Sequence, residues 1–190
     1  MKRINRNFGN LFLLSVLLMI SATVYSQDSR DRKLSREERK ELRQAEQAAN
    51  FNFINDLLAS QRFVVEADFL ENKYGDKVPV SPMINFIMMN ASEGVLQTGS
   101  NFRVGYNGVG GVTAEGTIGD FEFRSNMKSL SYTVKFDILT NLGSYDIIMN
   151  VYSDFRVRAT ISGVTSSKLI YTGKLEPLAK SKVHKGMKTI

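Results

Sequence analysis

Two pairs of carboxylates stand at alternate positions in strand-like stretches, Glu66 with Asp68 and Asp120 with Glu122. Side chains two positions apart on a strand share a face, which brings such acids near the ~5–9 Å separation used in glycoside hydrolysis. Phenylalanines occupy the opposite face of both stretches, so the acids are expected on the solvent side. A carboxylate-dependent glycan hydrolase acting through Asp120 and Glu122 is therefore the weaker functional alternative.

Few residues in the sequence could support other catalytic chemistry or bind a metal ion. The chain contains no cysteine, and its single histidine, His184, lies near the C-terminus. This excludes thiolate chemistry and makes a Ser-His-Asp triad or a His/Cys metal site a poor hypothesis. Glu71 and Asp76 in "ENKYGDK" are too few acids for a calcium loop. We predict no catalytic residue, no metal site and no cofactor, and thus a protein that is not an enzyme.

A glycine-rich run, "RVGYNGVGGVTAEG" (Arg103–Gly116), holds five of the 14 glycines. A phosphate-binding Walker loop would need lysine where Gly111 stands, and a dinucleotide fingerprint would need glycine where Thr113 stands. Strand-like sequence, not a helix, follows the run. We therefore predict a turn at Asn107-Gly108 between two strands.

Glycines also interrupt the strand that follows this turn. Gly116 and Gly119 lie within an otherwise strand-like stretch. Isolated glycines in a strand mark a bulge or a sharply coiled segment of sheet.

The N-terminus has the pattern of a secretory signal peptide. Lys2, Arg3 and Arg6 precede an uncharged apolar run, and small residues then lead to a cleavage site between Ser26 and Gln27. This pattern predicts export through Sec to the periplasm or the extracellular space. The predicted organisation is a signal peptide (1–26), a charged helical lead-in (27–50), a single β-rich domain with an N-terminal helix (51–177) and a basic flexible tail (178–190).

The charge is unevenly distributed along the chain. Removal of residues 1–26 lowers the net charge from +6 to +3, and residues 51–177 hold 11 basic and 13 acidic side chains. A nucleic-acid surface needs clustered basic residues on the domain itself, so nucleic acid is not an expected partner. The tail carries four lysines and no acid. It is predicted to be a solvated end, with weak contact to an anionic membrane surface as the alternative.

A long helix should precede the β-rich part. Ser35 and Glu38 form a capping box, and no glycine or proline follows until well past residue 60. Apolar residues then recur every three or four positions, as on one face of an amphipathic helix, with the C-terminal half expected to dock on the core. The predicted stripe is Leu42, Ala45, Ala49, Phe53 and Leu57, widened by Ile54 and Leu58 in the C-terminal half. The mostly charged first half is expected to project into solvent.

Beyond Arg62 the apolar period changes to two. Stretches such as "SYTVKFDIL" and "FRVRATIS" alternate apolar and polar residues, and short turns separate them. Gaps this short join antiparallel strands. The expected fold is mainly β, with an N-terminal amphipathic helix and an antiparallel meander of about eight strands. The sheet is a small closed or partly open barrel, lipocalin-like at the fold level, or a sandwich.

The chain resembles a family of exported Bacteroidota proteins known as domain of unknown function 4251. The resemblance rests on "VYSQ", "RFVVEADFL", "VSPMINFIMMN", "GVGGVTAEG", "YDIIMNVYSDFRVRATISG" and "LIYTGKL". It implies a small periplasmic β-domain behind an N-terminal helix. It implies no activity and supplies no functional residue.

Two functional hypotheses take precedence over the hydrolase. The first is a binding module that holds a small apolar ligand inside a barrel. The second is a cell-envelope module that binds another protein. The sequence indicates neither a ligand nor an oligomeric state. Aromatic residues that would line such a cavity are Phe121, Phe123, Tyr132, Phe136 and Tyr145.

Overall fold

The computed structural model of the protein describes residues 35–99, 111–163 and 168–189. The predicted signal peptide and the Asn107-Gly108 turn lie outside these ranges. Within them, no helix combines the length and the apolar character that a membrane crossing requires.

The described helix, α2 (Arg36–Ser60), begins with the predicted capping box. The Ser35 backbone N–H donates to the Glu38 carboxylate at 2.8 Å, and the Glu38 N–H donates to the Ser35 hydroxyl at 3.2 Å. The chain divides into two units after Glu41, and all described strands belong to the second unit.

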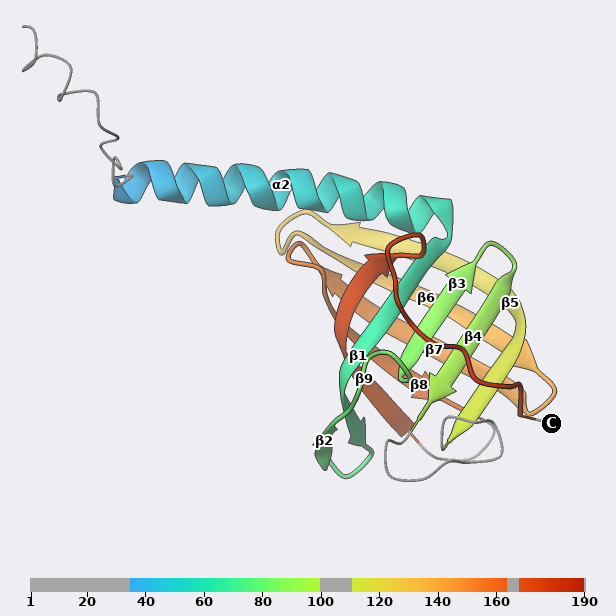
Figure 1. The fold of residues 1–190 in the computed structure, drawn as a ribbon. Coiled ribbons are helices and arrows are strands. Elements are labelled where there is room, and N and C mark those ends of the chain that lie inside the picture. The colour runs from blue at the N-terminus through green and yellow to red at the C-terminus, as the bar shows by residue number, and fades with distance from the viewer. Residues whose placement is uncertain (1–34, 100–110, 164–167, 190) are drawn as a thin grey trace, which may run out of the picture. The chain divides into compact units, whose positions relative to one another are not determined.

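The strands form one antiparallel barrel (Figure 1). Their order is β2-β1-β3-β4-β5-β6-β7-β8-β9, and β9 pairs back onto β1. That last pairing closes eight strands, while the short β2 extends the sheet beside the far end of β1. The predicted mainly β fold is confirmed, and of its predicted forms the closed barrel is the one observed. The bounds are β1 (Arg62–Asn72), β2 (Lys77–Pro79), β3 (Phe86–Asn90), β4 (Glu93–Thr98), β5 (Val112–Asn126), β6 (Ser131–Thr140), β7 (Gly143–Tyr152), β8 (Arg156–Ser162) and β9 (Lys168–Pro177).

The barrel interior is a packed apolar core. Strands β6, β7 and β8 alternate buried and exposed residues along most of their lengths, as the twofold pattern predicts. Aromatic and long aliphatic side chains from opposite walls share one buried cluster. The largest fully buried side chains of that cluster are Tyr132, Tyr171, Phe63, Ile54, Leu58, Ile87, Met89, Ile138, Ile147, Met149 and Leu175.

Two bulges change the phase of the alternation. In β1 the register with β9 shifts between Ala67 and Phe69. Because an inserted residue moves all later side chains to the other face, Phe69 is 38% exposed and Leu70 is buried. The sequence pattern, which placed Phe69 on the dry face, is wrong at this position. The second shift, in β5 between Gly119 and Glu122, confirms the bulge that glycine predicted.

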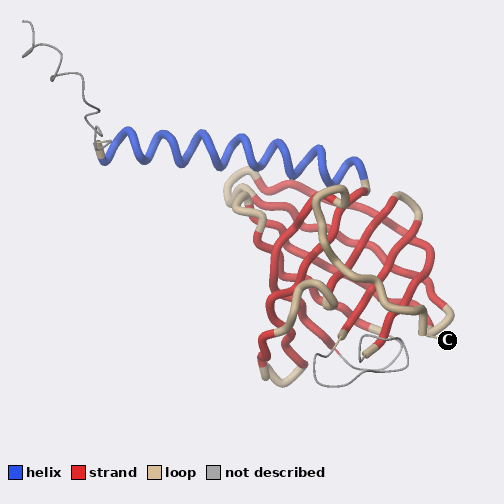
Figure 2. Tube along the Cα trace, viewed as in Figure 1, coloured by secondary structure: helices blue, strands red, loops and turns tan. Residues whose placement is uncertain are grey.

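The C-terminal half of α2 packs on the core as predicted, through Ile54, Leu57 and Leu58 of the predicted face. Phe51 is also buried, whereas Phe53, which the prediction placed on this face, is 46% exposed. The Phe51 ring stacks on Tyr132, with ring centroids 4.5 Å apart. Figure 2 shows α2 running directly into the strands, and the turn at Gln61 sets which helix face meets the barrel.

Residues 178–189, here named the C-terminal strap, lie along the outer wall of the barrel. The Leu178 N–H donates to the Arg62 carbonyl at 3.2 Å, and the Thr189 N–H donates to the Thr113 carbonyl at 2.9 Å. The sequence indicated a solvated, flexible tail here. The structure differs because the strap forms backbone hydrogen bonds with strands far away in sequence, which no local pattern encodes.

Candidate functional site

The five aromatic candidates belong to the packed core. Tyr132 and Phe136 are buried, and Phe121, Phe123 and Tyr145 are half-buried against the same cluster. Phe121 lies 6.1 Å from Phe136 between ring centroids, and Phe123 lies 6.1 Å from Tyr132. Such spacings are those of aromatic rings in mutual contact. These side chains fill space between the walls, and their role in binding a ligand stays a prediction.

Two buried tyrosines tie the core to the backbone around it. The Tyr132 hydroxyl donates to the Phe51 carbonyl at 3.1 Å, and the Tyr171 hydroxyl donates to the Gln97 carbonyl at 2.8 Å. Burial raises the pKa of Tyr132, and the negative charge of Asp56 adds to the rise. Burial also raises the pKa of Tyr171, against the opposing hydrogen bond with Thr98. Both hydroxyls therefore stay protonated, and their hydrogen bonds to backbone carbonyls stabilise the fold.

An open depression of about 620 Å³ lies on the outer wall where β5, β6 and β7 run side by side. The β5 bulge creates it, because Asp120 and Phe121 together stand opposite a single residue of β6. We name this feature the acidic depression. It is lined by Asp120, Phe121, Glu122, Lys135, Phe136, Asp137, Asp146, Ile147 and Ile148.

The carboxylates of the acidic depression are held close together by strand register. Asp137 of β6 is directly opposite Asp146 of β7, and like charges in that position destabilise a sheet. Asp137 also lies over Gly119, where a Cβ would stand 2.7 Å from its Oδ1. Asp120 adopts a φ of 44°, a left-handed conformation that is uncommon outside glycine. This patch thus combines electrostatic and backbone strain.

Few positive charges compensate these acids. Within the described residues, Glu122 pairs with Lys135 at 3.9 Å and with Arg124 at 3.5 Å. No ion pair reaches Asp120, Asp137 or Asp146 in those ranges. The acidic depression therefore presents uncompensated negative charge beside the exposed apolar side chain of Ile148.

The structure places the two predicted acid pairs on different walls of the barrel. Asp120 and Glu122 both line the acidic depression, although the bulge separates them and Glu122 is held in ion pairs. Glu66 lies on another wall, where its carboxylate accepts a hydrogen bond from the Ser181 hydroxyl at 2.6 Å. Asp68 falls at the β1 bulge. The two predicted pairs therefore do not form one site.

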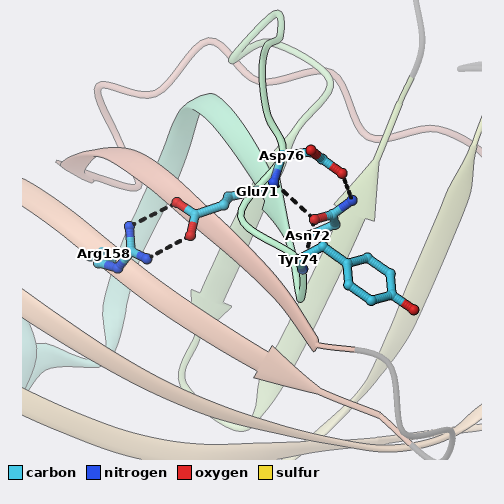
Figure 3. Close-up of polar contacts among 5 residues, drawn as sticks. All are labelled: Glu71, Asn72, Tyr74, Asp76 and Arg158. Atoms are coloured by element: carbon cyan, nitrogen blue, oxygen red, sulfur yellow. Dashed lines mark hydrogen bonds and ion pairs between the residues drawn. The ribbon is translucent and has the colours of Figure 1, made fainter.

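The two arginines of β8, Arg156 and Arg158, form ion pairs with carboxylates outside the predicted acid pairs. Arg158 forms two hydrogen bonds with Glu71, at 3.0 and 3.1 Å (Figure 3). These bonds hold the pKa of Glu71 below its usual value and raise that of Arg158. Arg156 pairs with Asp154 in the preceding turn.

The hairpin between β1 and β2, considered above as a calcium loop, is closed by its own side chains. The side-chain oxygen of Asn72, Oδ1, accepts hydrogen bonds from the N–H groups of Tyr74 and Asp76, at 2.9 and 3.0 Å (Figure 3). The Asn72 amide donates to the Asp76 carboxylate at 2.9 Å. This is a side-chain turn motif. Across the described ranges, no group of three acidic, histidine or cysteine side chains could hold a metal ion.

Sequence reasoning did not single out Asp137 and Asp146. Their opposition follows from the two-residue turn at Asn141 and Leu142, which pairs Thr140 with Gly143 and sets the register of the hairpin. Counting outward from that turn would have placed the two aspartates opposite each other.

The helix and the closed antiparallel barrel define a class of small β-barrel domains preceded by a helix. The family model described as "Domain of unknown function (DUF4251)" matches residues 45–175, and the chain belongs to this family. The predicted family membership is confirmed.

A solved structure of a protein from the same family has a similar fold. It is the crystal structure of a DUF4251 family protein from Bacteroides eggerthii DSM 20697. The sequences are 29% identical, the TM-score is 0.59, and the match covers 71% of this chain and 94% of that one. No curated protein matches this chain.

Proposed function

We propose that this protein is an exported, non-catalytic binding module, and that its binding surface is the acidic depression on the outer wall. The partner is a positively charged segment of another cell-envelope protein. Export is taken from the sequence of residues 1–26, and the binding surface from the geometry of β5, β6 and β7.

One observation carries the proposal: a depression of about 620 Å³ gathers Asp120, Asp137 and Asp146, for which the described residues provide no ion pair. Strain and like-charge contacts reduce stability, so their concentration at one concave place is typical of a functional surface. A partner's lysine or arginine would relieve the repulsion between Asp137 and Asp146.

The partner chemistry follows from what lines the depression. Long basic side chains combine an apolar stem with a charged head. Here the stem would lie along Ile148, which is 46% exposed, and the head would reach the carboxylates. Charge complementarity of this kind sets specificity and the rate of association.

The barrel interior supports a small apolar ligand less well. Aromatic and aliphatic side chains from opposite walls occupy the core, and the interior tyrosine hydroxyls already have hydrogen-bond partners. Glycan hydrolysis is also less well supported, because Glu122 is exposed and tied to two basic side chains.

Site-specific crosslinking in the native cell envelope tests the proposal. A photoreactive residue at Ile148 should capture one recurrent partner through a Lys- or Arg-rich segment, as identified by mass spectrometry. The same residue at Tyr74, which is 79% exposed on the β1–β2 hairpin, is the matched position away from the depression.

Charge variants decide whether the captured partner binds through the acids. The double variant Asp137→Asn/Asp146→Asn should lose the crosslink, and Asp68→Asn/Glu46→Gln, with the same change in net charge, should retain it. Equal capture at Ile148 and Tyr74, or a crosslink that survives in the Asp137/Asp146 variant, would overturn the proposal. So would turnover of a glycan that Asp120→Asn or Glu122→Gln abolishes.

A further inference from the structure

The C-terminal strap crosses the outer wall over β3, β4 and β5, away from the acidic depression (Figure 1). Its backbone is anchored along its whole length. In addition to the bonds at its two ends, the His184 N–H donates to the Met83 carbonyl at 2.7 Å. The strap is therefore an ordered part of the barrel wall.

A single buried side chain clamps the middle of the strap. The Gln97 amide nitrogen donates to the His184 carbonyl at 2.8 Å, and the Gln97 side-chain oxygen accepts from the Gly186 N–H at 2.7 Å. Gln97 is fully buried, and its remaining hydrogen bonds go to the Ile84 carbonyl and the Thr113 hydroxyl. All its hydrogen-bonding capacity is used, and half of it holds the strap.

Apolar side chains of the strap face the barrel. Leu178 and Val183 pack on an outward-facing cluster of Val64, Phe86 and Val95. With these positions turned inward, the lysines of the strap are left toward solvent. Lys180, Lys182, Lys185 and Lys188 are all exposed.

The exposed side of the strap is basic, with apolar side chains beside the charges. Lys185 pairs with Glu115 at 3.0 Å, whereas Lys180, Lys182 and Lys188 have no ion pair within the described residues. Met187 is 67% exposed, and Met83, whose carbonyl binds the strap, is 55% exposed. Of the acids on this wall, Glu66 and Glu115 are bonded to the strap itself.

We propose that the strap and Met83 form a docking surface for an anionic lipid bilayer. Lysines near a negatively charged leaflet are attracted to it, and exposed apolar side chains beside them can enter the headgroup region. The clamp at Gln97 fixes the lysines on one side, so little ordering is needed on binding. The two methionines favour a membrane over a dissolved polyanion, because only lipid offers them an apolar environment. This surface is independent of the one proposed for the protein partner.

Cosedimentation with vesicles tests the inference. The purified mature protein should bind vesicles of phosphatidylglycerol and phosphatidylethanolamine, and not vesicles of phosphatidylcholine. Binding should weaken as salt rises to ~0.15 M, where screening is strong. The variant Lys180→Gln/Lys182→Gln/Lys188→Gln should lower partitioning at least about tenfold, since each lysine near the surface contributes roughly a fivefold factor.

Matched variants separate this surface from a general effect of charge. Lys73→Gln/Lys128→Gln/Lys168→Gln removes as much charge from exposed positions outside the strap and should bind almost as the unchanged protein does. Met187→Gln should weaken binding, and Met127→Gln, at a methionine that is 69% exposed, should not.

Three results would overturn the inference. The first is an absence of binding to the anionic vesicles at low salt. The second is an equal loss in the two lysine triple variants. The third is strap-dependent binding to a soluble polyanion such as heparin without binding to vesicles, which would assign the surface to a dissolved ligand.

Discussion

The side-chain amide of Gln97 lies 2.8 Å from the backbone oxygen of His184, a residue 87 positions further along the chain. Through this bond a fully buried side chain of β4 holds a segment that contains four lysines. The relationship makes the C-terminal strap part of the barrel wall.

Replacement of Gln97 should release the strap. Gln97→Leu leaves the buried Thr113 hydroxyl and the Gly186 N–H without this acceptor, so the free energy of unfolding should fall by about 1–3 kcal/mol. Trypsin should then cleave faster after Lys182 and Lys185. Urea denaturation and limited proteolysis measure the two effects. Gln47→Leu, on an exposed part of α2, is the control, and equal proteolysis of both variants would contradict the clamp.

Tyr171 should make stability depend on alkaline pH. Its folded pKa is raised above the usual 10.0. Stability is therefore complete below that value and is lost at higher pH, where the unfolded chain releases a proton that the folded protein retains. The loss is at most about 1.4 kcal/mol per pH unit for one group. Urea denaturation near neutral pH and about one unit above the usual tyrosine pKa measures it.

The comparison variant is Tyr171→Phe. It should be less stable at neutral pH by about 1 kcal/mol, because the hydrogen bonds with Thr98 and the Gln97 carbonyl are lost. It should also lose less stability on going to alkaline pH. An alkaline loss equal to that of the unchanged protein would show that Tyr171 is not responsible.

Neutralising one member of the aspartate pair should stabilise the fold. Asp137→Asn removes the repulsion from Asp146, and the free energy of unfolding should rise by about 0.2–1 kcal/mol at low ionic strength. Added salt should reduce this gain, since exposed charges are screened. Asp154→Asn, which breaks the ion pair with Arg156, should give no gain. If Asp137→Asn destabilises the protein at low salt, the repulsion is compensated.

Two glycines of β5 should differ in their tolerance of a methyl group. In Gly116→Ala the new Cβ would overlap the backbone carbonyl of Leu139, so we expect a loss of about 1–3 kcal/mol. In Gly119→Ala the Cβ meets the Asp137 carboxylate at 2.7 Å, and that side chain can rotate away. Thermal denaturation should rank Gly116→Ala well below Gly119→Ala. Equal melting temperatures would contradict the close approach of β5 to β6.

Much of the fold could be predicted because it depends on local spacing. The alternation along "SYTVKFDIL" identifies the buried Tyr132, Val134, Phe136 and Ile138, and short turns impose antiparallel neighbours. The capping box at Ser35 and Glu38 is a contact between residues three apart, so the residue types suffice to find it. Gly119 likewise indicated its own bulge.

Other features depend on contacts that no local pattern describes. A bulge at Ala67 and Phe69 reverses which side chains face the core, and its position depends on pairing with β9, about a hundred residues away. Which of two nearby phenylalanines of α2 faces the core is decided by how the turn at Gln61 presents the helix to the barrel, which buries Phe51 and leaves Phe53 exposed.

The two proposed binding surfaces also depend on contacts between residues far apart in the sequence. The amino-acid order already determined antiparallel strands with one apolar face, because side chains in a strand alternate between faces whatever the strand's neighbours are. Closure of the sheet into a barrel decided how the strands and the C-terminal strap are arranged around the core. The opposition of Asp137 and Asp146, and the seating of the lysine-rich strap on Gln97, arise when register and long-range hydrogen bonds form together as the barrel closes.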